Sequence, residues 1–243
     1  EAVDFVNLLK ACAKRKDLHK GSQLHAAILK RGLLEKRSDL ATSLISMYSK
    51  CGAIKKAQIL HDELTVPSVV SWNALISGYA QHGSGEEAFQ CFDKMQYEGL
   101  CPNDVTFSCV LQACSSSIEY LNIGEVIHAE VIKVGALKKD VMIGTTLIDM
   151  YGKNGFCQTA EQIFDKLEVR DLVSWNTLIG GYLENGNCER VLEYFDEMKL
   201  NCVLPDSLTY ISVLKACASI GAIEKGRQIH EEIKEQGSLR TDY

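Results

Sequence analysis

Apolar side chains recur along the chain with the spacing of one face of an α-helix. One series, at positions i, i+3, i+4 and i+7, consists of Trp72, Leu75, Ile76 and Tyr79. A second series follows a Gly-Ser-Gly turn at residues 83–85 and consists of Ala88, Phe89, Phe92 and Met95. This period predicts two short helices joined by a tight turn, each with one apolar stripe.

The helix pair belongs to a longer internal repeat. The segment SVVSWNALISGYAQHGSGEEAFQCFDKMQYEGLCPN around Trp72 returns 103 residues later as DLVSWNTLIGGYLENGNCERVLEYFDEMKLNCVLPD around Trp175. The segment SLISMYSKCGAIKKAQILHDEL from Ser43 returns at the same offset as TLIDMYGKNGFCQTAEQIFDKL from Thr146. A third segment, with KAC or QAC followed by IH or LH, occurs three times, with its cysteine at Cys12, Cys114 and Cys217.

Seven helix pairs account for almost the whole chain. The predicted repeats are residues 2–37, 38–68, 69–103, 104–140, 141–171, 172–206 and 207–242. A pair this short cannot bury its apolar stripe alone, so neighbouring pairs must stack. No window is rich enough in Gly, Ser or Pro to be a linker. The pattern therefore predicts an all-α fold, a single α-solenoid array with a concave face.

The composition excludes several classes of protein. No run of about 18 apolar residues is present, which excludes a membrane span, and the N-terminal residues lack the layout of a signal peptide. The chain opens without Met and stops just after a repeat, so we expect it to be a piece of a longer protein. The ten cysteines stand in a long chain without an Asn-x-Ser/Thr site, which favours reduced thiols over a disulfide scaffold.

The repeated segments resemble pentatricopeptide repeats over almost all 243 residues. The motifs SWN-LI-GY and LI-MY-K-G and the KACA helix recur in register, and the alternating repeat lengths resemble the plant subclass built from P, L and S motifs, here in the order L, S, P, L, S, P, L. The resemblance implies a right-handed superhelix that binds single-stranded RNA, with one base per repeat. It also implies a chloroplast or mitochondrial RNA editing or processing factor, with editing-complex proteins as further partners.

The resemblance implies that the fifth and last residues of a repeat specify the base. In the P and S repeats these pairs are Thr42 with Ser68, Asn73 with Asn103, Thr145 with Asp171, and Asn176 with Asp206. By resemblance, Thr with Ser favours adenine, Asn with Asn cytosine, Thr with Asp guanine, and Asn with Asp uracil. If the N-terminal repeats lie on the 5′ side, the preferred RNA reads any-A-C-any-G-U-any.

The second residue of a repeat is the candidate platform on which a base stacks. The apolar residues at this position are Val70, Val105, Met142, Val173 and Leu208. Val70 lies one turn before Asn73, so we expect the two side chains to share a face. Asp39 takes this position in the second repeat, and a carboxylate beside a phosphate chain makes a poor platform. The L repeats carry Val6, Ser108 and Ile211 in fifth place, so we expect them mainly to space the others.

The net charge of −6 is unusual for a protein that binds phosphates. The predicted first helices are nearly neutral, and the acidic charge lies mainly on the second helices and loops. Affinity must therefore depend on bases more than on phosphates. Lysines that recur at the end of the first helix are candidate phosphate contacts: Lys14, Lys50 and Lys153.

Other motifs that suggest catalysis have simpler explanations. His61, His128 and His230 each begin the H-x-E pattern of a zinc deaminase, but the P-C-x-x-C that would complete the zinc site does not occur. His25, His128 and His230 share one repeat position, which favours a packing role, and the three recurrent cysteines fit buried small side chains. We therefore expect no catalytic site, metal or cofactor in this chain. Any deaminase chemistry would belong to a domain outside it.

Two alternatives to RNA binding remain. A peptide-binding adaptor of tetratricopeptide type has the same helical architecture and a similar groove. Such a groove usually carries clustered Lys, Arg or Asn, and it has no reason to repeat the paired fifth and last residues. An enzyme is the third possibility, disfavoured because no set of titratable residues converges in the sequence, and we expect no small-molecule substrate.

Overall fold

The computed structural model describes residues 2–34, 37–135, 137 and 140–240, and the helices found there confirm the all-α prediction. The first helices of the pairs, called helix A here, are α1 Ala2–Arg15, α3 Ser38–Lys50, α5 Val69–Gln81, α7 Asp104–Cys114, α10 Val141–Lys153, α12 Leu172–Glu184 and α14 Ser207–Ile220. The second helices, helix B, are α2 Leu18–Lys30, α4 Ile54–Asp62, α6 Gly85–Tyr97, α8 Leu121–Lys133, α11 Cys157–Asp165, α13 Cys188–Leu200 and α15 Ile223–Arg240, with a 3₁₀ turn η1 at Ile118–Tyr120. Each helix A begins at the first residue of a predicted repeat.

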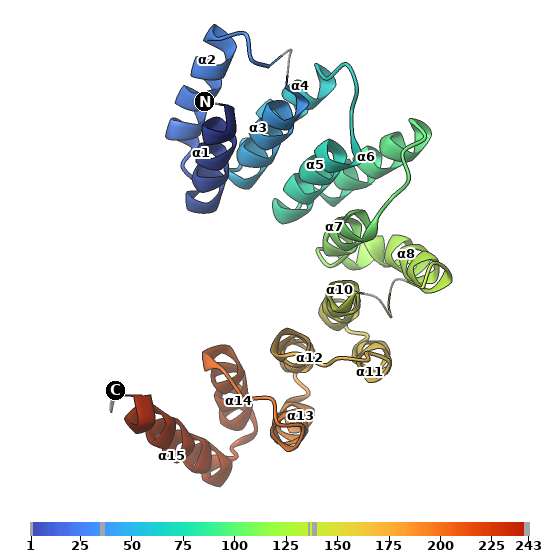
Figure 1. Cartoon of the computed structure of the whole chain (residues 1–243). Coiled ribbons are helices and arrows are strands. Elements are labelled where there is room, and N and C mark those ends of the chain that lie inside the picture. The colour runs from blue at the N-terminus through green and yellow to red at the C-terminus, as the bar shows by residue number, and fades with distance from the viewer. Residues whose placement is uncertain (1, 35–36, 136, 138–139, 241–243) are drawn as a thin grey trace. The chain divides into compact units, whose positions relative to one another are not determined.

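The chain forms two compact units, residues 1–131 and 132–243. In the first unit α1, α3, α5 and α7 pack side by side, and α2, α4 and α6 each pack against their own helix A (Figure 1). In the second unit α10, α12 and α14 form the equivalent row. No helix within the described residues is long and apolar enough to cross a membrane.

The predicted apolar stripes form the core of each unit. On α12, Trp175, Leu178, Ile179 and Tyr182 are all buried. The equivalent Trp72 on α5 is buried as well, and its indole N–H donates to Oε2 of Glu98 at 3.1 Å. Burial of large apolar side chains between neighbouring pairs supplies the main stabilising free energy of such a stack.

Neighbouring A helices approach closely through small residues. A Cβ atom built on Gly181 of α12 would lie 3.2 Å from the Cα atom of Gly152 on α10. In the first unit, a Cβ atom on Gly78 of α5 would lie 2.6 Å from the Cβ atom of Ser49 on α3. The small side chains at these crossings bring the A helices close enough for side chains of consecutive repeats to contact each other.

His61 and Phe164 occupy equivalent places beside the two tryptophans. The ring of His61 lies 4.1 Å from that of Trp72, and that of Phe164 lies 4.6 Å from that of Trp175, centroid to centroid. His61 is buried, and its Nε2 atom has no hydrogen-bond partner among the described residues. Burial lowers the pKa of His61 below its ordinary value, since desolvation disfavours the charged imidazolium.

Replacing His61 by Phe is expected to stabilise the protein by about 1 kcal/mol at pH 7, because an unpaired buried nitrogen is removed. The gain should grow as the pH falls. Between the ordinary histidine pKa and the lowered folded value, the unfolded wild type binds more protons than the folded one. The stability of the wild type therefore decreases as the pH is lowered. Urea unfolding of both proteins at pH 7 and pH 5 measures this difference. A gain that is the same at both pH values would contradict the assignment.

Candidate nucleic-acid interface

The last residue of each P or S repeat caps the helix A that follows. Oδ1 of Asn103 accepts the backbone N–H of Thr106 at 3.0 Å, and Oδ1 of Asp206 accepts that of Thr209 at 2.9 Å. Ser68 and Asp171 cap α5 and α12 in the same way. Ser, Asn and Asp favour this position because their short side chains reach the unpaired N–H groups of a helix start.

In the two P repeats, the fifth residue is hydrogen-bonded to the last. Nδ2 of Asn73 donates to Oδ1 of Asn103 at 3.1 Å, and Nδ2 of Asn176 donates to Oδ1 of Asp206 at 3.1 Å. The structure thus brings together two pairs that the sequence singles out. Asn73 is only 7% exposed and Asn176 is partly buried, so neither Asn is a helix-start residue that simply faces water.

At the ends of the two P repeats, the hydrogen bonds of the capping side chain gather on one of its two terminal atoms. Those that Asp206 accepts from Asn176 and Thr209 all end on Oδ1, which leaves Oδ2 available. The equivalent bonds end on Oδ1 of Asn103 and leave its Nδ2 available. The backbone N–H of Thr209, followed by its hydroxyl and the Asn176 amide, lowers the pKa of Asp206. The carboxylate therefore offers only an acceptor, whereas the free end of Asn103 offers a donor.

The S repeats are built differently. The hydroxyl of Thr42 donates to the carbonyl of Ser38 at 2.9 Å, and that of Thr145 donates to the carbonyl of Val141 at 2.9 Å. Within the described residues no hydrogen bond joins Thr42 to Ser68 or Thr145 to Asp171. The proton of each hydroxyl is committed to its own helix, so the oxygen can serve a base only as an acceptor.

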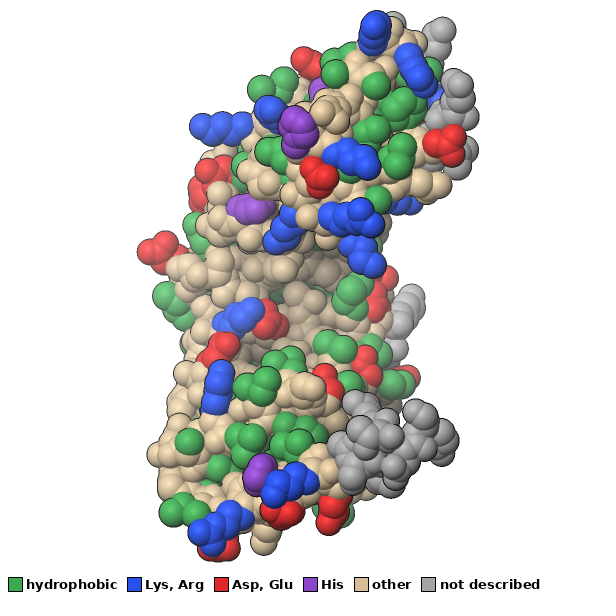
Figure 2. Space-filling view, turned by 90° about the vertical axis from the view of Figure 1, so that its left-hand side faces the viewer, with side chains coloured by type: hydrophobic (Ala, Val, Ile, Leu, Met, Phe, Trp, Pro, Cys, Tyr) green, Lys and Arg blue, Asp and Glu red, His purple; other side chains and the backbone are tan. Residues whose placement is uncertain are grey.

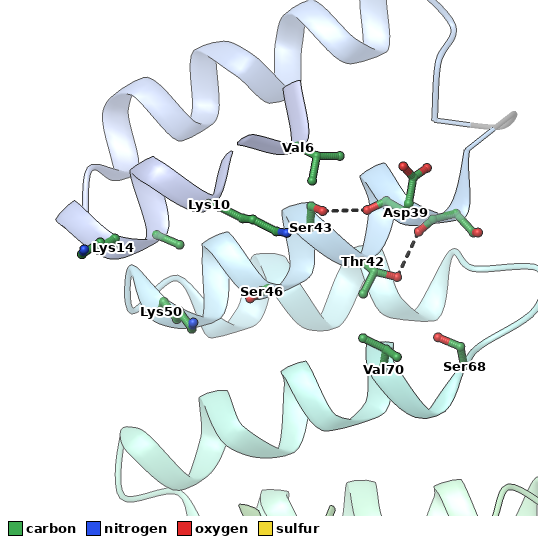
Figure 3. A pocket seen from close by; sticks show the side chains of 12 residues that line it. Val6, Lys10, Lys14, Asp39, Thr42, Ser43, Ser46, Lys50, Ser68 and Val70 are labelled. Carbon is green, nitrogen blue, oxygen red and sulfur yellow. Dashed lines mark hydrogen bonds between the residues drawn. The ribbon is translucent and has the colours of Figure 1, made fainter. Parts of the chain in front are cut away.

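The candidate platform residues are all exposed. The exposed fractions range from 48% to 64% for Val70, Val105, Met142, Val173 and Leu208. Val70 lies beside Thr42 and Ser68 in a groove of about 710 Å³ along α1, α3 and α5 (Figure 3). Val173 and Leu208 line a second groove of about 400 Å³ with Asn176 and Asp206. Apolar side chains exposed in a groove are a suitable surface for base stacking.

The carboxylate of Asp39 is not isolated. Nε of Arg37 donates to its Oδ1 at 2.9 Å, and a second guanidinium nitrogen contacts Oδ2. This hydrogen bonding lowers the pKa of Asp39. Arg37 therefore compensates the charge of Asp39, and the expectation that a carboxylate is a poor platform for a base stays a prediction.

The candidate phosphate contacts differ between the units. Lys14 and Lys50 lie at the edge of the first groove together with Lys10, and the described residues offer none of the three an acidic partner (Figure 3). Basic side chains also gather on the upper part of the face in Figure 2, where the first helix pairs lie. Lys153, in contrast, forms an ion pair with Asp149 at 2.8 Å. The second groove also contains Glu184 and Asp206, so it is the more acidic of the two.

Replacing Lys14 and Lys50 by Gln together should weaken RNA binding and flatten its salt dependence. Removing one phosphate contact should lower the slope of log Kd against log salt by about 0.7. Lys153→Gln should change the slope less, since Asp149 already compensates that charge. Equilibrium binding to one RNA at several salt concentrations gives the slopes of the wild type and both variants. Equal slopes in all three proteins would exclude these phosphate contacts.

The histidines and cysteines of the motifs that suggest catalysis differ in their surroundings. His25 bonds the hydroxyl of Tyr48, a residue of the following repeat, at 3.0 Å through Nδ1, whereas His230 lies in the last repeat and has a 64% exposed side chain. None of the ten cysteines, all of which lie within the described residues, takes part in a disulfide. Burial raises the pKa of Cys114 to about 12 and leaves it protonated. No group of three metal-binding side chains comes together within the described part of the chain.

Models of known repeat families match most of the chain. Two models, described as the PPR repeat family and the PPR repeat, match residues 67–116 and 170–219 and residues 40–66, 145–172 and 208–238. Together they cover 40–116 and 145–238, more than half of the chain.

Similar relatives are pentatricopeptide repeat-containing proteins of Arabidopsis thaliana. One is 34% identical over 98% of this chain and 28% of its own length. A chloroplastic relative is 36% identical over 96% of this chain and 37% of its own, and a mitochondrial relative is 35% identical over 97% and 28%. The chain therefore spans less than half the length of these relatives.

A solved structure shares the fold. It is the pentatricopeptide repeat protein PPR10 in complex with an 18-nt psaJ RNA element, 19% identical, with a TM-score of 0.53. The likeness covers 98% of this chain and 41% of that one. It supports the helix-pair architecture predicted from the apolar periodicity.

Proposed function

The chain belongs to the pentatricopeptide repeat family, and from this premise we propose that it binds single-stranded RNA in a sequence-dependent way. Each P or S repeat reads one base, and the L repeats space them. The observation that carries this proposal is the recurrent pair of fifth and last residues. In both P repeats the pair is joined by a hydrogen bond, one terminal atom remains available, and an exposed apolar residue lies nearby.

The available atom explains how the last residue selects a base. Oδ2 of Asp206 accepts a hydrogen bond but cannot donate one, which suits the ring N–H of uracil. Nδ2 of Asn103 donates, which suits the bare ring nitrogen of cytosine. The same distinction separates guanine from adenine at Asp171 and Ser68, where the oxygen of a shorter Thr in fifth place leaves room for a purine.

The apolar second residues supply a contact that does not depend on base identity. A base stacked on Val70 or Val173 removes from water the apolar surface of the side chain and that of the base. This contribution does not depend on phosphate contacts, so it is available in both grooves. In the second repeat, Arg37 and Asp39 take the place of an aliphatic side chain.

We further propose that the chain is the RNA-recognition part of an organellar cytidine-to-uridine editing or RNA processing factor of the P-L-S subclass. The order of repeat lengths supports the subclass, and the chloroplastic and mitochondrial names of the relatives support an organelle. On this proposal the deaminase chemistry is supplied by a domain or partner outside the chain, and editing-complex proteins are the further partners.

Selection from a random single-stranded RNA pool tests the proposal directly. The enriched sequences should contain A-C, one unconstrained base, and then G-U, with G opposite Thr145 and Asp171 and U opposite Asn176 and Asp206. A parallel peptide library separates this function from that of a peptide-binding adaptor. Binding without any base preference, or binding only to peptides, would contradict the proposal.

A further inference from the structure

Thr106 and Thr209 lie at the junction of two consecutive repeats. Each is the third residue of its own repeat and is fully buried. Its hydroxyl contacts side chains of the preceding repeat: Thr106 Oγ1 lies 2.8 Å from Oδ1 of Asn73, and Thr209 Oγ1 lies 2.6 Å from Oδ1 of Asn176. The same arrangement occurs independently in the two units.

The hydrogen bonds around the hydroxyl determine where its single proton goes. The backbone N–H of Asn103 donates to Thr106 Oγ1 at 3.1 Å, so the oxygen already acts as an acceptor. Its proton has two possible acceptors, Oδ1 of Asn73 at 2.8 Å and Oδ1 of Asn103 at 3.0 Å. The amide of Asn73 is the nearer one, and Oδ1 of Asn103 already receives two N–H donors.

This donor fixes the orientation of the Asn amide. With Oδ1 held by the threonine hydroxyl, Nδ2 points to the capping residue, and its second N–H remains for a base. Asn73 is almost completely buried, so loss of the donor would leave its Oδ1 without a partner. The side chain would then rotate toward water and separate from Asn103, because an unpaired buried acceptor is costly.

The repeats that follow the two S repeats provide a contrast. Their third residues are Ser71 and Ser174, whose hydroxyls donate to the carbonyls of Ser68 and Asp171 at 2.9 and 2.8 Å. The fifth residues that precede them bond their own helix and need no outside donor. Threonine therefore stands where an Asn must be held, and serine stands where it need not be.

We propose that Thr106 and Thr209 are positioning residues for base reading in the repeat that precedes each of them. The inference rests on the proposed function, since it assigns a role within the same site. It makes the reading site of a P repeat a set of three side chains, two from that repeat and one from the next.

Thr106→Val tests the inference, because it removes the hydroxyl and keeps the shape. Discrimination between cytosine and uracil opposite the third repeat should fall by about tenfold, while discrimination opposite the sixth repeat stays unchanged. Thr106→Ser, which keeps the hydroxyl, should restore it in large part. Ser71→Ala is the matched control, since it removes a comparable helix-start bond to Ser68 without a link to a fifth residue.

A second measurement needs no RNA. Side-chain NMR of the free protein should find Asn73 in one rotamer in the wild type and in Thr106→Ser, and in several rotamers in Thr106→Val. If Asn73 stays fixed in the Val variant, or if that variant weakens all RNAs equally with an unchanged base preference, the inference is overturned. If the wild type itself shows no base preference, the proposed function fails, and the rotamer measurement still decides the role of Thr106.

Discussion

Replacing Asp206 by Asn should move the base preferred by the sixth repeat from uracil to cytosine. Asn can keep the two N–H hydrogen bonds that end on Oδ1, from the fifth-residue amide and from the backbone, as Asn103 does at the equivalent position. Only the outward atom changes, from an acceptor to a donor. The expected change in discrimination between the two bases is about 1 to 3 kcal/mol.

The measurement is equilibrium binding to RNAs that differ only at the base opposite the sixth repeat, at fixed salt. Removing a negative charge also raises affinity in general, so the ratio of the two affinities is the relevant quantity. Asn103→Asp is the reciprocal control and should move the third repeat from cytosine to uracil. If Asp206→Asn changes the affinity for every RNA by the same factor, Asp206 only caps α14 and does not read a base.

Replacing Trp175 by Ala should destabilise the second unit by about 3 to 5 kcal/mol. Trp175 is fully buried, and its ring lies 4.6 Å from that of Phe164 and 6.3 Å from that of Tyr194, centroid to centroid. Truncation removes apolar packing against Phe164 on α11 and Tyr194 on α13. It leaves a cavity that the rigid neighbouring side chains fill only in part. This loss is a large fraction of the stability of an ordinary domain.

Urea unfolding followed by circular dichroism measures the loss. Trp175→Phe is the matched control. The indole N–H of Trp175 has no partner among the described residues, so Phe sacrifices ring area but no hydrogen bond. Trp72→Phe, in contrast, also removes the bond to Glu98 and should cost more. A loss below about 1 kcal/mol for Trp175→Ala would mean that the two neighbouring helices close over the cavity.

The fold could be predicted in detail because local and nonlocal signals agree. The apolar spacing around Trp72 gives the helix, the turn at residues 83–85 joins the pair, and the 103-residue recurrence gives the register. Capping side chains such as Asn103 and Asp206 mark where each next helix begins. The packing of neighbouring helix pairs requires the same helices that these local signals favour, so it does not override them.

The site was only partly predictable. Position in the repeat identified Asn73 and Asn103, but not that the amide of Asn73 is buried and bonded to both Asn103 and Thr106. The burial of Asn73 and its two hydrogen bonds depend on how closely two A helices approach. The pattern of residues along the sequence does not give this distance. The capping signature Asn103-Asp-Val-Thr106 was a signal for the threonine, although it suggests only a bond within one turn.

The charged residues were the least predictable. The ion pairs Arg37 with Asp39 and Lys153 with Asp149 join side chains only two and four residues apart, but many such neighbours remain unpaired in water.

On the proposed function, the capping side chain both starts a helix and reads a base, and this affects how such arrays diversify. Ser68, Asn103, Asp171 and Asp206 all belong to the small group of residues that start a helix well. An exchange between Asp and Asn therefore changes the chemistry offered to a base while the helix start keeps its acceptor. New target sequences become accessible through single substitutions that are nearly neutral for folding. The need to cap the helix excludes long side chains at this position. The residues that can both start the helix and read a base are therefore limited to the few good helix caps.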